Sequence, residues 1–75
     1  MRDISLYVKT IDGCSWYVGD QPADPSRGPC HALGRYIYRA SIWSAEENRQ
    51  RAEGYARAVV SMYQDHASLR YTIAD

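Results

Sequence analysis

Apolar and polar side chains alternate in the first part of the chain. Positions 4, 6 and 8 are apolar, and the alternation resumes from 14 to 18 after the segment Ile11-Asp12-Gly13. A two-residue period is typical of a strand with one buried face, and an Asp-Gly pair between two such runs is typical of a hairpin turn. The sequence therefore predicts a β-hairpin over residues 4–18.

The length of the turn decides which side chains share a face of this hairpin. A two-residue loop would place Trp16 on the polar face. A three-residue loop with Gly13 in the left-handed conformation pairs Val8 with Trp16 and Leu6 with Val18, which keeps one face apolar. We therefore predict the three-residue loop, formed by a type I turn and a glycine bulge.

The next two segments, residues 19–34 and 35–43, differ sharply in composition. The first holds all three prolines and three of the five glycines of the chain, which predicts a long loop of the kind that is often functional or mobile. The second, RYIYRASIW, has the pattern of a strand with apolar side chains on both faces, so we expect it to be central in the sheet. The row predicted to face the core consists of Tyr36, Tyr38 and Ile42.

A helix is predicted for residues 44–66. Ser44, with Glu47 three positions later, forms a capping-box pattern at its start. The apolar stripe of this helix consists of Ala52, Tyr55, Ala56, Val59, Met62 and Tyr63. Two pairs of opposite charge have the i,i+4 spacing that stabilises helices: Glu47–Arg51 and Glu53–Arg57.

A last alternating segment at 69–73 predicts another strand. The order is then strand, strand, strand, helix, strand, within a single domain of residues 1–75. We expect an α+β fold, with a small four-stranded, mostly antiparallel sheet and one long helix packed on one face. The last three elements can also form a β-α-β crossover, which would make the sheet mixed.

Composition excludes several classes of protein. Of the 75 residues, 45% are hydrophobic and 12% aromatic, which suits one folded core and not two. Nine basic and nine acidic side chains give a net charge of zero, whereas nucleic-acid-binding domains are usually basic. No apolar stretch reaches the roughly 20 residues of a membrane span, and the N-terminus lacks the pattern of a signal peptide. We therefore expect a cytoplasmic protein.

Few residues are available for catalysis or metal binding: Cys14, Cys30, His31 and His66. Their spacing does not match paired zinc ligands. A cytoplasmic location disfavours a disulfide between Cys14 and Cys30. Cys30 beside His31 lacks a third group to orient it, and adjacent side chains rarely point at each other. We expect no enzymatic activity, no metal site and no cofactor.

Binding is the better prediction, because one helix covers only one face of the sheet. The uncovered face is expected to carry Tyr7, Tyr17, Arg35, Arg39 and Trp43, with Tyr7 opposite Tyr17 across the hairpin. Aromatic and arginine side chains are enriched in the hot spots of protein interfaces. We predict that this face and the 19–34 loop contact a protein partner.

Two other functions would use the same features. Tyrosine and arginine on an open sheet can stack single-stranded bases, although zero net charge makes direct nucleic-acid binding the weaker prediction. A homo-oligomer, most simply a homodimer, would cover the aromatic face or pair a long edge strand at 4–11. A steep loss of affinity with salt is expected only for nucleic-acid binding.

The size and organisation of the whole chain, with a hairpin, one sheet and one capped helix (SAEENRQRAEGYARAVVSMY), resemble the small inhibitors that phages and mobile elements encode. Anti-CRISPR proteins are the best-known group of these. The resemblance implies an inhibitor that sterically blocks a host protein or ribonucleoprotein complex in the host cytoplasm, often as a dimer. It involves no diagnostic motif and therefore assigns no site residues. The neutral charge argues against mimicry of DNA.

Overall fold

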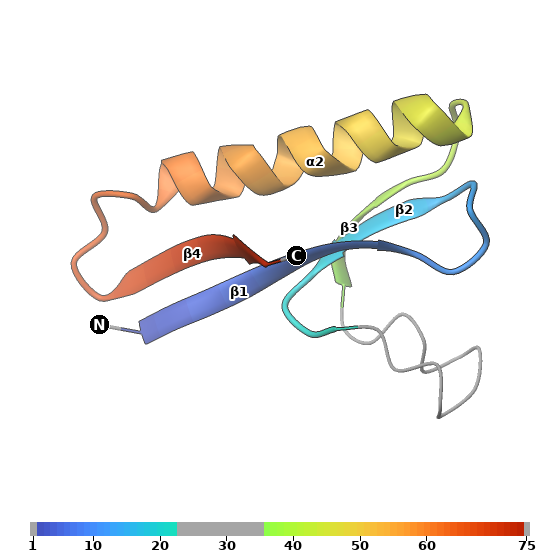
Figure 1. Ribbon diagram of the computed structural model, residues 1–75. Coiled ribbons are helices and arrows are strands. Elements are labelled where there is room, and N and C mark those ends of the chain that lie inside the picture. The colour runs from blue at the N-terminus through green and yellow to red at the C-terminus, as the bar shows by residue number, and fades with distance from the viewer. Residues whose placement is uncertain (1, 23–35, 75) are drawn as a thin grey trace.

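The computed structural model describes residues 2–22 and 36–74. In this part of the chain, four strands form one sheet and a long helix lies across one of its faces (Figure 1). The elements are β1 (Arg2–Thr10), β2 (Trp16–Gly19), β3 (Tyr36–Ala40), α2 (Ala45–Met62) and β4 (Leu69–Ala74). The α+β prediction and the order of the elements are confirmed. Most of the predicted 19–34 loop lies outside the described residues.

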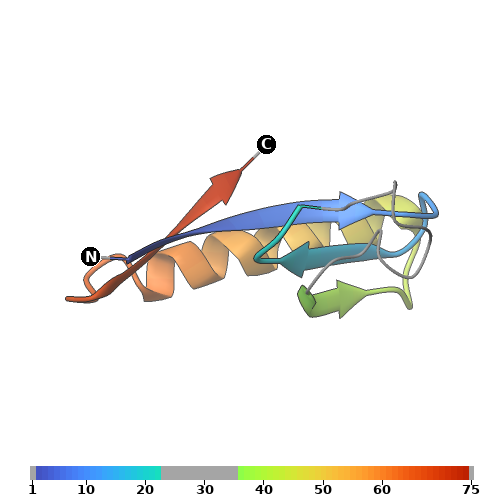
Figure 2. The ribbon, with the colours of Figure 1, turned by 90° about the horizontal axis from the view of Figure 1, so that it is seen from below.

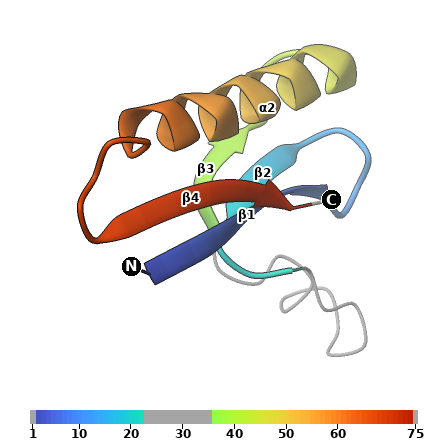
Figure 3. The same ribbon diagram turned by 60° about the vertical axis from the view of Figure 1, so that its left-hand side comes forward.

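The strand order in the sheet is β3-β2-β1-β4. β2 is antiparallel to both of its neighbours, but β4 runs parallel to β1. The connection through α2 therefore carries the chain from one edge of the sheet to the other, past two intervening strands (Figure 3). The sheet is mixed, as the β-α-β alternative predicted, and not mostly antiparallel.

This strand order corrects two predictions. The 35–43 segment, expected to be central, forms β3 at an edge of the sheet. The 4–11 segment, considered as an edge strand, forms β1, which pairs on both sides. The β1–β4 register sets Leu6 against Ile73, so apolar side chains of both strands share the helix-facing side. β3 carries apolar side chains on both faces. Because β3 has a strand neighbour on one side only in the described part of the sheet, a second neighbour cannot be the reason for this pattern.

β1 and β2 are joined by a loop of residues 11–15, which is longer than the three-residue loop predicted. Val8 therefore pairs with Val18 and not with Trp16. The pairing is displaced by two residues, and such a shift leaves every side chain on its predicted face. Gly13 has a φ of 78°, which is the left-handed conformation expected of it.

Side-chain hydrogen bonds explain the longer loop. The Asp12 carboxylate accepts from the backbone N–H groups of Ser15 and Cys14, each at 2.8 Å. The Thr10 hydroxyl donates to the Ser15 carbonyl at 2.7 Å and accepts from the Gly13 N–H at 3.0 Å. These contacts satisfy backbone groups that a tighter hairpin would pair between strands. The N–H groups of Ser15 and Cys14 also hold the pKa of Asp12 below its ordinary value.

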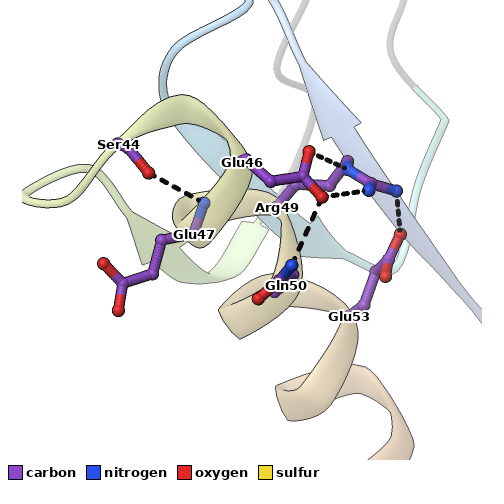
Figure 4. A network of polar contacts seen from close by, with 6 residues as sticks. All are labelled: Ser44, Glu46, Glu47, Arg49, Gln50 and Glu53. Atoms are coloured by element: carbon purple, nitrogen blue, oxygen red, sulfur yellow. Dashed lines mark hydrogen bonds and ion pairs between the residues drawn. The ribbon is translucent and has the colours of Figure 1, made fainter.

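α2 begins where the capping pattern predicts. The Ser44 side chain accepts a hydrogen bond from the Glu47 N–H at 3.2 Å (Figure 4). The Glu47 carboxylate pairs with Arg51, as predicted, at 3.3 Å. The helix ends at Met62, short of the predicted end at residue 66.

The second predicted ion pair of the helix is replaced by another. The Arg49 guanidinium lies between the carboxylates of Glu46 and Glu53 and pairs with both, the contact with Glu53 being 3.1 Å (Figure 4). Glu53 is therefore not paired with Arg57. The hydrogen bond from Arg49 lowers the pKa of Glu46. All of these side chains are well exposed, so the network adds little to stability.

The core lies between α2 and the sheet. Leu6 and Val18 of the sheet and Ala52 and Ala56 of the helix are fully buried, and Val59 lies beside them. The two alanines allow the helix to approach the strands closely. Half-buried residues surround this cluster: Val8, Trp16, Tyr38, Tyr55, Val60, Tyr63 and Tyr71.

Two pairs of tyrosines extend the core between the layers. Tyr38 of β3 stacks on Tyr55 of α2, with ring centres 4.3 Å apart and planes 10° apart. Tyr63 meets Tyr71 of β4, with ring centres 4.8 Å apart. These contacts confirm that Tyr55 and Tyr63 belong to the predicted apolar stripe of the helix. Met62 was expected in the same stripe, but it is 75% exposed.

Gly54 lies inside α2 although none of the described residues near it requires a glycine. Among them, a β-carbon added at Gly54 would meet only Nη2 of Arg57, at 3.9 Å, which is an ordinary contact with a flexible side chain. We expect Gly54→Ala to raise the free energy of unfolding by about 1 kcal/mol, because glycine weakens a helix by that amount relative to alanine. Urea denaturation would measure the change. Gly13→Ala is the contrasting variant, expected to be less stable than wild type because of its positive φ. A Gly54→Ala protein no more stable than wild type would contradict this account.

Candidate protein-binding surface

The structure separates the five residues that were predicted to form one binding face. Arg39 is exposed, Tyr7 is half-buried, and Tyr17 is only 5% exposed. Trp43 lies beyond the end of β3, and Arg35 lies outside the described residues. The prediction of an open aromatic face is therefore wrong for Tyr17, which lies on the central strand β2 and is buried.

Tyr17 does lie on the face of the sheet opposite α2, as predicted, but its ring is covered. Its ring and that of Tyr36 meet edge to face, with centres 5.2 Å apart. The guanidinium of Arg39, its partner across the β2–β3 pair, lies 5.8 Å from the Tyr17 ring centre. A ligand would have to displace these contacts to stack on Tyr17.

Lys9 is the second buried group on this face. It stands opposite Tyr17 in the register, where Tyr7 was predicted, and it is 8% exposed. Its ammonium group donates a hydrogen bond to the carbonyl of Gln21 at 2.6 Å. Burial lowers the pKa of Lys9, and the nearby charge of Asp20 partly opposes that shift. Lys9 is therefore a buried part of this face, and its side chain is not available as part of an open contact surface.

A bulge in the β2–β3 pairing determines where the tyrosines of β3 point. The register shifts between Val18 and Gly19, which leaves Ile37 as an extra residue on β3. Tyr38 consequently points to α2, whereas Tyr36 points away from it. The prediction that both tyrosines face the core is confirmed for Tyr38 and wrong for Tyr36. This bulge also accounts for apolar side chains on both faces of an edge strand.

Large apolar side chains are exposed at β3 and just beyond it. Tyr36 is 45% exposed, Ile37 48%, Ile42 80% and Trp43 36%. Ile42, predicted to face the core, lies past the end of the strand and is open to solvent. With the exposed Arg39 they make up what we call the β3 edge surface. In the described part of the sheet, β3 has a strand neighbour on one side only (Figure 2).

Trp43 is fixed in this surface by contacts with α2. The guanidinium of Arg51 lies 3.7 Å from its ring centre, which is a close cation–π contact. The Trp43 N–H donates to Oδ1 of Asn48, and the Trp43 carbonyl accepts from Nδ2 of the same side chain, both at 3.1 Å. Nδ2 also donates to the carbonyl of Cys14 at 2.7 Å. One asparagine thus links the β1–β2 loop to the segment that carries Trp43.

Asn48, which is 1% exposed, was not among the residues predicted to form the site. A signal for it was present in the sequence. Asparagine is a weak helix former, and position 48 lies on the same face of the helix as Ala52 and Tyr55. A polar side chain within an apolar stripe must find hydrogen-bond partners when it is buried.

No group of three or more His, Cys, Asp or Glu side chains that could hold a metal ion occurs in residues 2–22 and 36–74. Cys14 is a free, exposed thiol in the β1–β2 loop, not a strand residue. His66 accepts a hydrogen bond from the Ser68 N–H at 3.1 Å and so supports the turn after α2. Cys30 and His31 lie outside the described residues.

Comparisons of this chain with protein-family models, curated proteins and solved structures found no match. Among the described residues, no helix is long and apolar enough to cross a membrane. The functional interpretation therefore rests on the β3 edge surface.

Proposed function

We propose that the protein is a non-enzymatic binding domain whose β3 edge surface docks on a partner protein. The clustering of exposed apolar side chains carries this proposal. Among the described residues, seven large apolar ones are exposed: Ile11, Tyr36, Ile37, Ile42, Trp43, Met62 and Ile73. Four of the seven lie within residues 36–43. Single exposed apolar residues are ordinary, but a group of them at one edge indicates an interaction surface.

The composition and rigidity of this surface suit a protein partner. Tyrosine, tryptophan and arginine are the residues most often found in interface hot spots. Trp43 is already held by Arg51 and Asn48, so it loses little conformational freedom when a partner binds. An edge strand can also offer backbone hydrogen bonds to a strand of the partner.

Steric blocking of a host protein or effector complex is the form of binding that we propose, in line with the resemblance to anti-CRISPR proteins. The β3 edge surface contains one arginine and no acidic residue, so its charge does not imitate DNA. Single-stranded nucleic acid has weaker support as a ligand, because the predicted stacking residue Tyr17 is buried.

Capture from host lysate with charged variants tests this proposal. Ile37→Asp and Ile42→Asp each place a carboxylate on the β3 edge surface. Met62→Asp is the matched control, since Met62 is 75% exposed at the C-terminal end of α2. We expect wild type and the control to retain the same protein after nuclease treatment, and each edge variant to retain about tenfold less. Thermal unfolding should change little, because all three side chains are exposed.

Three outcomes would contradict the proposal. Both edge variants could retain the partner as well as wild type does. The partner could be released by nuclease, with affinity falling steeply as salt rises, which would indicate nucleic-acid binding. Sedimentation could show that the partner is only a second copy of the chain, which would make the surface a homodimer interface.

A further inference from the structure

Two side chains of α2 hold Trp43, and they act on different parts of it. Asn48 bonds to its backbone, accepting from the Trp43 N–H and donating to the Trp43 carbonyl. These bonds fix the chain direction but not the two side-chain torsions that orient the indole ring. The guanidinium of Arg51, 3.7 Å from the ring centre, acts on the ring itself. Among the described residues, no aromatic side chain pairs with this ring, so its orientation depends on Arg51.

The position of Arg51 in the helix explains the contact. α2 begins at Ala45, so Trp43 lies just before its first turn. Helical side chains lean towards the N-terminus of their helix, which directs Arg51 back along α2 towards Trp43. The carboxylate of Glu47, one turn before Arg51, pairs with the guanidinium at 3.3 Å. The group that covers one face of the Trp43 ring is therefore itself held in place.

The chemistry of arginine suits this contact. A planar guanidinium can stack on an aromatic ring and still donate from its edge to a carboxylate, whereas a lysine ammonium is a compact charge without a plane. Trp43 remains 36% exposed although Arg51 lies over one face of its ring. The exposed part of the ring is thus presented to solvent in one orientation.

We propose that Arg51 is a positioning residue for partner binding, which fixes the Trp43 ring so that its exposed part is ready to pack on the partner protein. This inference rests on the proposed function of the β3 edge surface, to which Arg51 does not itself belong. Ordering a mobile side chain at an interface weakens binding by roughly twofold to tenfold. A ring that Arg51 has already oriented avoids this loss, so Arg51 raises the affinity without contacting the partner.

Arginine-to-glutamine variants at two positions of α2 test this role. The probe is the protein that wild type retains from nuclease-treated host lysate. Arg49→Gln is the matched control for Arg51→Gln, since Arg49 is also paired with glutamate and its side chain is 40% exposed, against 46% for Arg51. We expect Arg51→Gln to bind the probe about fivefold more weakly, Arg51→Lys to recover part of that loss, and Arg49→Gln to bind like wild type. Thermal unfolding should change little, because these ion pairs are exposed.

Two further measurements show whether Arg51 acts through the ring. In NMR spectra of the free chain, Arg51→Gln should shift the indole signals of Trp43 and leave those of Trp16 in place. In a double-mutant cycle with Trp43→Ala, Arg51→Gln should have no further effect on binding. An equal effect of Arg51→Gln in both backgrounds would mean that Arg51 contacts the partner directly, which would overturn the proposal.

The remaining outcomes separate this inference from the proposed function. If Ile42→Asp reduces retention of the probe but Arg51→Gln does not, the positioning role is wrong and the β3 edge surface stands. If neither variant reduces retention, or if wild type retains no protein, the proposed function is wrong and this inference with it. Equal losses for Arg51→Gln and Arg49→Gln, or Trp43 signals that do not respond to Arg51→Gln, would overturn the positioning role alone.

Discussion

Replacing Asn48 with aspartate is expected to lower the free energy of unfolding by about 3 kcal/mol. The Asn48 side chain is 1% exposed, and its Nδ2 donates hydrogen bonds to the carbonyls of Cys14 and Trp43. An aspartate carboxylate has the same shape but cannot donate. It would place a buried negative charge against two carbonyl oxygens, which is unfavourable both by repulsion and by loss of hydration.

Urea denaturation and thermal unfolding would measure this loss. For a domain of this size, a change of about 3 kcal/mol corresponds to a Tm lower by more than about 10 °C. Gln64→Glu makes the same amide-to-carboxylate change at an exposed position just after α2, and it should alter stability by less than about 0.5 kcal/mol. An Asn48→Asp protein as stable as this control would show that the buried hydrogen bonds contribute little.

The pH dependence of the same variant provides a second check. Burial raises the pKa of the introduced carboxyl in the folded state, so the folded protein binds a proton more readily than the unfolded chain does. The protonated carboxyl can again donate one hydrogen bond. The stability deficit relative to wild type should therefore be largest at neutral pH and should narrow as pH falls. A deficit that is independent of pH would indicate a packing defect instead.

Local features of this fold were predictable from the sequence. Ser44 and Glu47 mark the start of α2, and the capping hydrogen bond between them is present. The alternation around Leu6 and Val18 assigns the buried face of the hairpin, and both residues are fully buried. These features depend on residues that are close together in the chain, so periodicity and spacing are enough to predict them.

Features that depend on distant residues were not predictable in the same way. β4 lies beside β1 because these two strands pack together. Their paired residues, such as Leu6 and Ile73, are more than sixty positions apart in the sequence. The bulge at Ile37 turns Tyr36 away from the core, and alternation alone cannot reveal an inserted residue. Because the bulge turns Tyr36 towards the ring of Tyr17, Tyr17 is buried and is not part of the candidate site. Arg39 and Trp43 remain in the exposed surface.

The charge pairs of α2 show a limit of spacing rules. Glu53 has an arginine four residues away in each direction, Arg49 and Arg57, and it pairs with Arg49. The i,i+4 rule allows both pairs, so the sequence could not choose between them. Arg57 consequently forms no ion pair with any described residue.

Replacing Leu6 with alanine is expected to lower the free energy of unfolding by about 2–5 kcal/mol. Among the described residues, Leu6 is the largest apolar side chain that is fully buried, and the rest of the buried cluster consists of valines and alanines. These smaller neighbours on α2 and β2 have little side chain with which to fill a cavity. A chain of 75 residues has a net stability of about 4–11 kcal/mol, so this one substitution would remove a large part of it.

Two further variants show whether the loss comes from the cavity. Ile42→Ala removes a side chain of similar size that is 80% exposed, and it should change stability by less than about 0.5 kcal/mol. Leu6→Met keeps the volume and should cost less than about 1.5 kcal/mol. The urea midpoint should fall for Leu6→Ala while the slope of the transition stays constant, because the same surface is exposed on unfolding. Equal stability of Leu6→Ala and Ile42→Ala would contradict this account. It would show that the packing of Leu6 against Ala52 and Ala56 of α2 is not the centre of the core.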